Sequence, residues 1–379
     1  MDTWYIRTEH MDVGYDGVPL IRDIEIGVRR GEILTLIGPN GSGKSTILKS
    51  MICQLKLLAG MVVLDGRPMA AMGEGEIARK MAIVMTERLR EELMTGEDVV
   101  ATGRYPYTGR LGILTKADKA IVQEAIALVH GEAFAQRPFN QISDGQRQRL
   151  LLARAVCQEP EVIVLDEPTS FLDVKHKLEL LEILKGLVRE RNVAVLMSLH
   201  ELDLAQKISD RVVCVANNAV DRCGTPEEIF TNEYIEALYG MEKGSYNALF
   251  GSLEMARVPG EPRVFVIGGA GSGIPVYRAL QRRGVPFAAG VLAENDVDYG
   301  VARALAVETV SVPAFTPVGE AAMDRARALI STCAHVVCCL DGFGTTNEGN
   351  RILRDEAAAR GKLLPLDRLS DLWTGGEAP

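Results

Sequence analysis

The sequence predicts an α/β protein of two domains, each built on a mostly parallel sheet with helices on both faces. Three observations predict it. Continuous aliphatic segments such as Ile33–Ile37 and residues 162–165 are typical of strands buried on both faces. Stretches rich in Leu, Glu and Lys with helical spacing lie between them. The 379 residues, 47% of them hydrophobic and 25% charged, are more than one ordinary domain needs.

Composition excludes several classes of protein. A net charge of −9 argues against nucleic acid, because a protein that neutralises phosphates usually carries excess positive charge. No apolar run approaches the roughly 18 residues that cross a bilayer, and the first residues lack the basic, then apolar start of a secretory signal. The seven cysteines form no Cys-x-x-Cys pair. We expect reduced thiols in a cytoplasmic protein.

The elements follow in order along the chain. Strands are expected at Tyr5-Ile6 and at residues 24–28, 33–37, 82–85, 162–165 and 193–197, with a helix from about Ser45. Turn residues are concentrated just before Pro262. The composition also changes there, because Lys362 and Met323 are the only lysine and the only methionine of the sequence after Val258. We therefore expect a first domain over 1–240, a linker over 241–262 and a second domain over 263–379. Its strands are predicted at 264–267, 287–292, 309–312 and 336–340.

A glycine-rich turn directly follows the strand at Ile33–Ile37. It matches the pattern G-x-x-x-x-G-K-[ST] and consists of Gly38, Pro39, Asn40, Gly41, Ser42, Gly43, Lys44, Ser45 and Thr46. Glycines let backbone N–H groups turn toward phosphate oxygens, and the following helix adds the positive end of its dipole. Lys44 supplies a point charge for the terminal phosphates, and the Ser45 hydroxyl can ligate Mg²⁺. The turn predicts a P-loop that binds a nucleoside triphosphate with Mg²⁺.

Two acids end the strand at 162–165. Asp166 and Glu167 lie at the carboxyl end of a parallel strand, which is where ligands bind in such sheets. Asp166 can hold Mg²⁺ through water, and Glu167 can polarise a water molecule for attack on the γ-phosphate. In isolation the same pair could be helix-capping acids before Pro168. Beside a P-loop, hydrolysis of the nucleotide is the better interpretation.

Further motifs resemble those of ABC-type ATPases over residues 1–240. Ile142-Ser143-Asp144-Gly145-Gln146-Arg147-Gln148-Arg149 resembles the signature motif, Ser170-Phe171-Leu172-Asp173 resembles the D-loop, His200 resembles the switch histidine, and Tyr15 stands where the family stacks an aromatic ring on adenine. The resemblance implies an ATPase with a RecA-like core, an antiparallel β subdomain and a helical subdomain. It implies catalytic roles for Lys44, Glu167 and His200. It also implies a head-to-tail homodimer, in which Ser143, Gly145, Gln146 and Asp173 serve the ATP held by the other copy.

Three positions depart from the pattern of that family. Ile142 stands where leucine is commonest. Asp144 stands where glycine is commonest, so its carboxylate is expected to point away from phosphate or to cap a helix. Thr86 stands where most relatives have the Q-loop glutamine. A threonine side chain reaches less far than a glutamine, so the resemblance of Thr86 to a ligand of Mg²⁺ or of the attacking water is incomplete.

The segment Val99-Val100-Ala101-Thr102-Gly103-Arg104-Tyr105-Pro106-Tyr107-Thr108-Gly109 resembles ATPases of metal-chelate importers. Those systems carry ferric siderophores, haem or cobalamin. The resemblance implies a protein on the inner face of the plasma membrane, partnered by permease subunits and indirectly by a substrate-binding protein. A soluble ABC ATPase outside transport is the alternative. The single P-loop, without an inserted coiled coil, favours the importer.

The second domain carries its own glycine-rich turn, Gly268-Gly269-Ala270-Gly271-Ser272-Gly273. Such a turn can hold a phosphate or dinucleotide, and Glu294, Asp296 and Asp298 follow the next strand, where a ribose-binding acid would lie. Tight packing of strand on helix would also explain the glycines. Cys333, Cys338, Cys339 and His335 are metal ligands by type, but small core residues are the better interpretation. Residues 263–364 loosely resemble an extension of some cobalamin-importer ATPases. A sensor of a nucleotide or a corrinoid is therefore expected, with a fused dinucleotide-dependent enzyme as the alternative.

Overall fold

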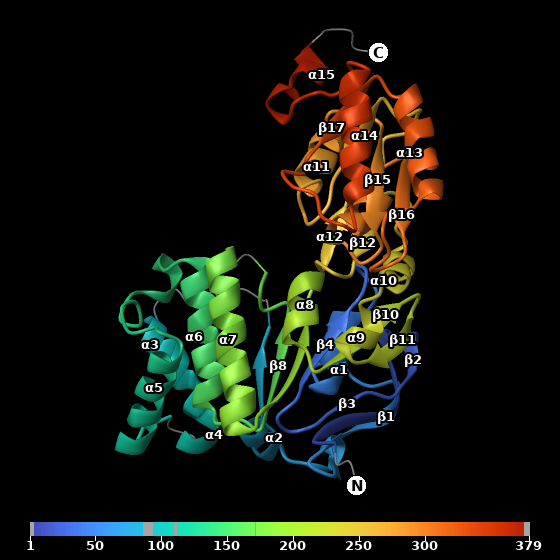
Figure 1. Ribbon diagram of the computed structural model, residues 1–379. Helices are drawn as coiled ribbons and strands as arrows, with labels where there is room; N and C mark the ends of the chain where they lie inside the picture. Colours follow the sequence, from blue (N-terminus) through green and yellow to red (C-terminus); the bar gives the residue numbers. More distant parts are fainter. Residues whose placement is uncertain (1–3, 86–93, 110–111, 171, 375–379) are drawn as a thin grey trace. The chain divides into compact units, whose positions relative to one another are not determined.

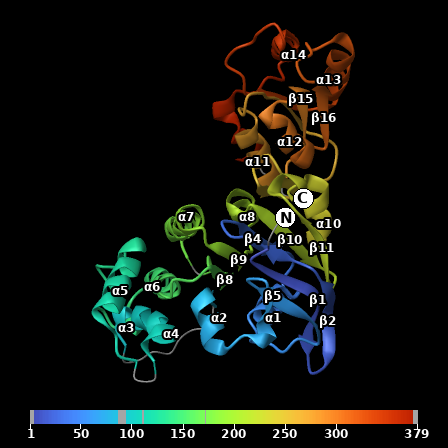
Figure 2. The same cartoon turned by 90° about the horizontal axis from the view of Figure 1, so that it is seen from below.

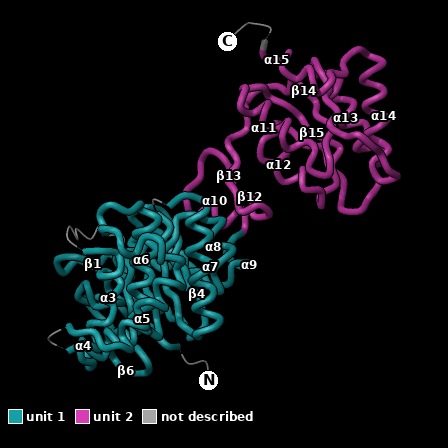
Figure 3. Tube along the Cα trace, turned by 90° about the vertical axis from the view of Figure 1, so that its left-hand side faces the viewer, with its two compact units in different colours: residues 1–230 teal, residues 231–379 magenta. Residues whose placement is uncertain are grey.

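The computed structural model describes residues 4–85, 94–109, 112–170 and 172–374 (Figure 1). The chain divides into two compact units, Met1–Phe230 and Thr231–Pro379 (Figure 3). The segment that was expected to link the domains carries a short antiparallel hairpin of β12 (Ser245–Asn247) and β13 (Ser252–Glu254), which belongs to the second unit. Among the described helices, none is both long enough and apolar enough to span a membrane.

A six-stranded sheet forms the centre of the first unit. Its strands lie in the order β11-β10-β4-β9-β8-β7, and all are parallel except β11. They are β4 (Ile33–Ile37), β7 (Met81–Val84), β8 (Val162–Asp166), β9 (Ala194–Ser198), β10 (Arg211–Ala216) and β11 (Ala219–Gly224). Every residue of β4, β8 and β9 is buried, as continuous aliphatic strands predict. In the register of β8 and β9, Asp166 lies opposite Ser198.

A second, antiparallel sheet lies beside this core. Its strands are β1 (Ile6–Tyr15), β2 (Val18–Ile24), β3 (Gly27–Val28), β5 (Ala59–Leu64) and β6 (Arg67–Pro68). The expected single strand over 24–28 is wrong, because the chain breaks between Ile24 and Gly27. The buried Thr8 explains the break: its hydroxyl donates to the Ile24 carbonyl at 2.7 Å and accepts from the Ile26 N–H at 2.9 Å. The Thr8 hydroxyl thus takes the place of a backbone group of a neighbouring strand as the hydrogen-bond partner of this segment.

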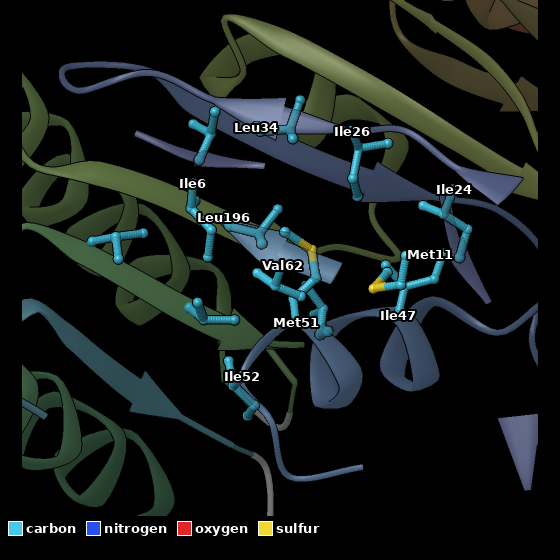
Figure 4. Close-up of a cluster of buried hydrophobic side chains, with 14 of the residues drawn as sticks. Ile6, Met11, Ile24, Ile26, Leu34, Ile47, Met51, Ile52, Val62 and Leu196 are labelled. Atoms are coloured by element: carbon cyan, nitrogen blue, oxygen red, sulfur yellow. The ribbon is translucent and has the colours of Figure 1, made fainter. Parts of the chain in front are cut away.

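The hydrophobic core between the two sheets holds helix α1 (Lys44–Met51) in place. Met11 and Ile24 from the antiparallel sheet and Leu196 from the parallel sheet belong to this core, and Ile47 and Met51 project into it from α1 (Figure 4). All five side chains are completely buried. Because α1 directly follows the glycine-rich turn, this packing fixes the turn against the carboxyl edge of the central sheet.

A group of helices lies on one side of the central sheet, away from β1 and β2 (Figure 2). It contains α3 (Gly96–Ala101), α4 (Tyr105–Thr108), α5 (Lys116–Leu128) and α6 (Asp144–Cys157), and α6 contacts both α3 and α5. Besides α1 and these, the described α-helices of the unit are α2 (Glu74–Lys80), α7 (Val174–Arg191), α8 (Leu202–Ile208) and α9 (Pro226–Ile229). The expected arrangement of a parallel core, an antiparallel subdomain and a helical subdomain is confirmed.

The second unit has a four-stranded parallel sheet in the order β16-β15-β14-β17, and the expected Rossmann-like α/β fold is confirmed. Its elements are β14 (Val264–Ile267), α11 (Ile274–Arg282), β15 (Phe287–Ala293), α12 (Val297–Leu305), β16 (Glu308–Val312), α13 (Glu320–Thr332), β17 (His335–Cys338) and α14 (Glu348–Ala359), flanked by α10 (Asn232–Tyr239) and α15 (Asp371–Thr374). Cys338 and Cys339 pack into cores on opposite faces of this sheet. Among the described residues they join no cluster of potential metal ligands.

Candidate active site

The glycine-rich turn between β4 and α1 follows a path that side chains would obstruct. Gly38, Gly41 and Gly43 have φ values of 146°, 77° and 103°, a region that strongly favours glycine. A Cβ atom on Gly38 would lie only 2.0 Å from the Val215 carbonyl oxygen. The turn therefore brings backbone close to backbone at the edge of the sheet, as a phosphate-binding loop must.

Lys44 begins α1, and its ammonium group lies inside the turn. Nζ donates to the carbonyl oxygens of Gly38 at 2.8 Å and Pro39 at 3.0 Å, and the residue is buried. Burial lowers the pKa of the ammonium, while the nearby charges of Glu167 and Asp166 act in the opposite direction. The charge is thus held where a triphosphate would lie in a P-loop.

A hydroxyl and a carboxylate meet below the turn. Ser45 Oγ donates to Asp166 Oδ1 at 3.1 Å, and Ser198 Oγ donates to the same oxygen at 2.7 Å. Asp166 is 6% exposed, so its carboxylate is held by neighbours rather than by bulk water. Hydroxyl and carboxylate oxygens are the ligands that Mg²⁺ prefers. The donor set of Ser45 and Asp166 therefore fits a magnesium ion.

Glu167 is held by three groups in a backbone conformation that is uncommon for its residue type. Its φ is 50°, and its N–H donates to Ser198 Oγ at 2.9 Å. One carboxylate oxygen lies 2.5 Å from His200 Nε2, and the other accepts from Ser170 Oγ at 3.2 Å. Left-handed backbone at a non-glycine residue concentrates at functional sites. Here it turns the carboxylate toward His200.

Part of this arrangement lines one cavity of about 480 Å³. Its described lining includes Asn40, Lys44, Ser45, Glu167 and His200, which the sequence analysis named as candidate site residues. Asp166 is not part of that lining and is connected to it through Ser45. Tyr15 and Thr46 also contribute, and Tyr15 Oη lies 3.1 Å from Thr46 Oγ1. The Tyr15 side chain is largely exposed, which leaves its ring accessible to a flat partner.

The residues of the signature-like motif lie outside that cavity. Ser143 and Gln146 form a capping box at the start of α6, with Ser143 N donating to Gln146 Oε1 at 3.0 Å and Gln146 N donating to Ser143 Oγ at 3.2 Å. Asp144 pairs with Arg147 at 2.6 Å, so its carboxylate is held by the helix that it begins. Thr86 and Phe171 lie outside the described residues.

Two residues that contact the candidate site residues have no signal in the motifs. Ser198 is fully buried and touches both acids, although only its place at the end of a strand could have indicated it. The ring of His176 lies against the signature glycine, since a Cβ atom on Gly145 would approach it to 3.2 Å. Asp173 accepts from the His176 N–H at 2.9 Å, and this hydrogen bond lowers the pKa of Asp173. His176 thus connects α6 to the start of α7.

The fold and the cavity together define a P-loop protein that binds and hydrolyses a nucleoside triphosphate. The sequence profile of the family described as "ABC transporter" matches residues 21–170, and that of the "MJ0874 family" matches residues 287–378. An ABC transporter ATP-binding protein of Methanocaldococcus jannaschii is 41% identical over 76% of this chain and 100% of its own length. The cobalamin import ATP-binding protein BtuD of Halobacterium salinarum is 32% identical over 92% of this chain and 94% of its own length.

Solved structures agree with these matches. A solved structure of an ATP-binding subunit of an ABC transporter is 26% identical, with a TM-score of 0.53 over 60% of this chain and 92% of its own. A bacterial ABC transporter cassette, solved as a dimer, is 25% identical, with a TM-score of 0.52 over 58% of this chain and 98% of its own. The chain belongs to the family of ABC transporter ATP-binding proteins. It binds ATP, and it is an ATPase coupled to transport.

Proposed function

We propose that this chain energises the import of a corrinoid, acting on a membrane permease from the cytoplasmic face. The coverage of the named relatives carries the proposal. The cobalamin import protein matches 92% of the chain and therefore includes the second unit. Relatives named for achromobactin transport and for siderophore transport match 62% and 65%, which is about the extent of the first unit. A ferric siderophore is the second candidate for the cargo.

Hydrolysis would use the groups gathered in the cavity. Glu167 accepts a proton from the attacking water, and His200, 2.5 Å from one carboxylate oxygen, keeps that carboxylate oriented. Lys44 binds the terminal phosphates, and Tyr15 stacks on the adenine ring. Ser45 and Asp166 would hold Mg²⁺, which when bound neutralises charge on the phosphate oxygens. The hydrogen bonds of Ser198 to both acids set the spacing between the metal ligand and the base.

Two copies would complete each site. Ser143 and Gly145 are not among the described residues that line the cavity with Lys44, which supports a site completed by the start of α6 of a second copy. Gln146 and Asp173 would lie at the same junction. The helix start supplies N–H groups and the positive end of its dipole to the phosphate. ATP would thus hold two copies head to tail, and hydrolysis would release them.

The helical subdomain offers a surface for the permease. Tyr105 and Tyr107 are exposed there, at 62% and 38%. Arg104 beneath them is buried, pairs with Asp118 at 2.9 Å and Glu159 at 2.7 Å, and lies 4.0 Å from the centre of the Tyr107 ring. Exposed aromatic residues on a rigid support are typical of interface anchors. A substrate-binding protein would deliver the cargo to the other side of the permease.

Uptake by cells that carry the permease tests the proposal. Cells lacking their own importer would express this chain with its permease, and uptake of radiolabelled cyanocobalamin would be compared with that of a ferric hydroxamate. We expect cobalamin uptake that the Glu167→Gln chain, expressed at the same level, does not support. Fractionation gives a second readout. A chain that stays soluble while its permease is present in the membrane would favour the alternative of an ABC ATPase outside transport.

A further inference from the structure

The glycine-rich turn of the second unit already binds carboxylates of its own chain. Ala270 N donates to Asp296 Oδ1 at 3.0 Å and Oδ2 at 2.9 Å, and Gly273 N donates to Asp298 Oδ2 at 2.9 Å. Ser272 N donates to the Gly269 carbonyl at 3.0 Å. The second residue of α11 is a proline, which has no N–H. The amides that would surround a phosphate in a Rossmann turn are thus largely used internally.

The glycines of this turn are explained by internal packing. A Cβ atom on Gly268 or Gly273 would lie 2.5 Å or 2.4 Å from Tyr277 Oη, and 2.9 Å from an oxygen of Asp298 in both cases. Asp298 is completely buried, and its Oδ1 has no hydrogen-bond partner among the described residues. Burial raises the pKa of Asp298. Two glycines are therefore needed to accommodate an acid and a tyrosine beneath the turn, whatever binds above it.

A cavity of about 410 Å³ lies at the carboxyl edge of this sheet, within the size range of small-molecule sites. Among the described residues that line it, Asp296 is the only charged one, and none is a lysine or an arginine. Asn295, Thr316 and Asn347 contribute neutral polar groups, while Val312 and Val318 contribute an apolar wall. The electrostatics are opposite to those of the P-loop in the first unit, where Lys44 supplies an ammonium group.

An aromatic side chain lines the same cavity. Phe315 is 86% exposed, and its φ is 59°. Left-handed backbone is unfavourable for a bulky residue. Because the phenyl ring is exposed, the hydrophobic effect does not compensate for that cost in this structure. Both features are accounted for if the ring is presented to a flat ligand.

We propose that this cavity binds an uncharged or cationic small molecule, which donates N–H or O–H groups to Asp296 and stacks a flat face on Phe315. It does not bind a dinucleotide, because two negatively charged phosphates would meet the Asp296 carboxylate, no lysine or arginine among the described lining residues, and turn amides that already donate within the chain. A free nucleoside-like molecule and the amide-bearing rim of a corrinoid share this chemistry. The suggestion that the ligand is a corrinoid rests on the proposed function, whereas the proposal of a binding site in this cavity does not.

Calorimetric titration of the full chain, with the P-loop site saturated with Mg-ADP, tests the proposal. The probes would be adenosine, the cationic corrinoid cobinamide and NADH, each up to about 1 mM. We expect adenosine or cobinamide to bind, and NADH not to bind. Binding of cobinamide would identify cargo as the ligand, and binding of adenosine alone would identify a separate signal. Neither result depends on the permease, so a failed transport experiment would leave the site intact.

Variants of residues that line the cavity test whether the probe binds there. Phe315→Ala should weaken binding about tenfold, and because the ring is exposed, the fold should not change. The N–H groups of Ala270 and Asp298 both donate to the Asp296 carboxylate, the latter at 2.9 Å. Asp296→Asn keeps an acceptor for these amides and should weaken binding of the cationic probe most. Glu294→Gln removes a neighbouring charge outside the cavity and serves as the matched control. NADH binding that is sensitive to Phe315→Ala, or failure of both other probes to bind, would overturn the proposal.

Discussion

Ser198 links the two acids of the ATPase site, and its replacement by alanine is a sharp test of the site geometry. Its hydroxyl donates to Asp166 Oδ1 at 2.7 Å and accepts from the Glu167 N–H at 2.9 Å, in a completely buried position. Ser198→Ala removes both hydrogen bonds at once. Asp166 Oδ1 then loses one of its hydrogen-bond donors, and the Glu167 N–H loses the Ser198 acceptor.

The magnitude follows from these two contacts. A hydrogen bond to a charged group contributes about 1.5–3 kcal/mol, and a buried donor without a partner costs about 1–3 kcal/mol. The two losses overlap, so the free energy of unfolding of the first unit should fall by about 2–4 kcal/mol. For a domain of this size that corresponds to roughly 5–15 °C in melting temperature. Turnover should fall about 10- to 100-fold, as when a partner that orients a metal ligand is lost.

Thermal unfolding and phosphate release measure the two effects, and Ser50→Ala is the matched control. Ser50 lies in α1, is also completely buried, and its hydroxyl has no hydrogen-bond partner among the described residues. Its replacement should leave melting temperature and turnover close to those of the unmodified chain. If Ser198→Ala behaved like Ser50→Ala, the hydrogen bonds of Ser198 could not be what spaces the two acids.

Three further predictions concern other parts of the chain. Glu167→Gln should reduce ATP turnover by about 10²–10⁴-fold while equilibrium ATP binding is retained; wild-type turnover would exclude Glu167 as the base. Burial lowers the pKa of Lys44, so its ammonium group should lose its proton at a pH below the ordinary pKa of 10.5. As the pH rises, the ATP affinity of the unmodified chain should therefore begin to fall at a lower pH than that of Lys44→Arg. Identical pH profiles for the two chains would contradict this. Asn350→Ala removes both hydrogen bonds to the Val291 peptide, each 2.9 Å long, and should destabilise the second unit by about 2–4 kcal/mol. Calorimetry should then show one transition lowered and ATPase activity retained; a shift of both transitions would argue against independent units.

The sequence was sufficient to predict elements whose signal is local. β4 and β14 have the predicted bounds because each is a continuous apolar run that ends at a glycine turn. The grouping of Lys44, Asp166 and Glu167 was also predictable, since the carboxyl ends of parallel strands and the P-loop meet at one edge.

The sequence was insufficient where a distant side chain decides the outcome. Thr8 interrupts the expected strand at 24–28 from elsewhere in the chain, and no pattern around Ile26 indicates it. The acids after β15 have the spacing of ribose ligands, yet Asp296 and Asp298 bind amides of the turn instead. A glycine motif indicates the path of the backbone, but it does not indicate whether the backbone N–H groups of the turn already donate to side chains of the same chain.

The capping box of α6 has a consequence for how two copies meet and separate. A hydroxyl group has one proton and two lone pairs. In the cap, Ser143 Oγ uses a lone pair to accept from Gln146 N. In the proposed head-to-tail arrangement, its proton would remain available to a phosphate oxygen bound by the second copy. The end of the helix need not fray or reform when a second copy arrives with nucleotide. Threonine should preserve this double use and alanine should abolish it, so association can be reversed in every cycle without rebuilding the helix.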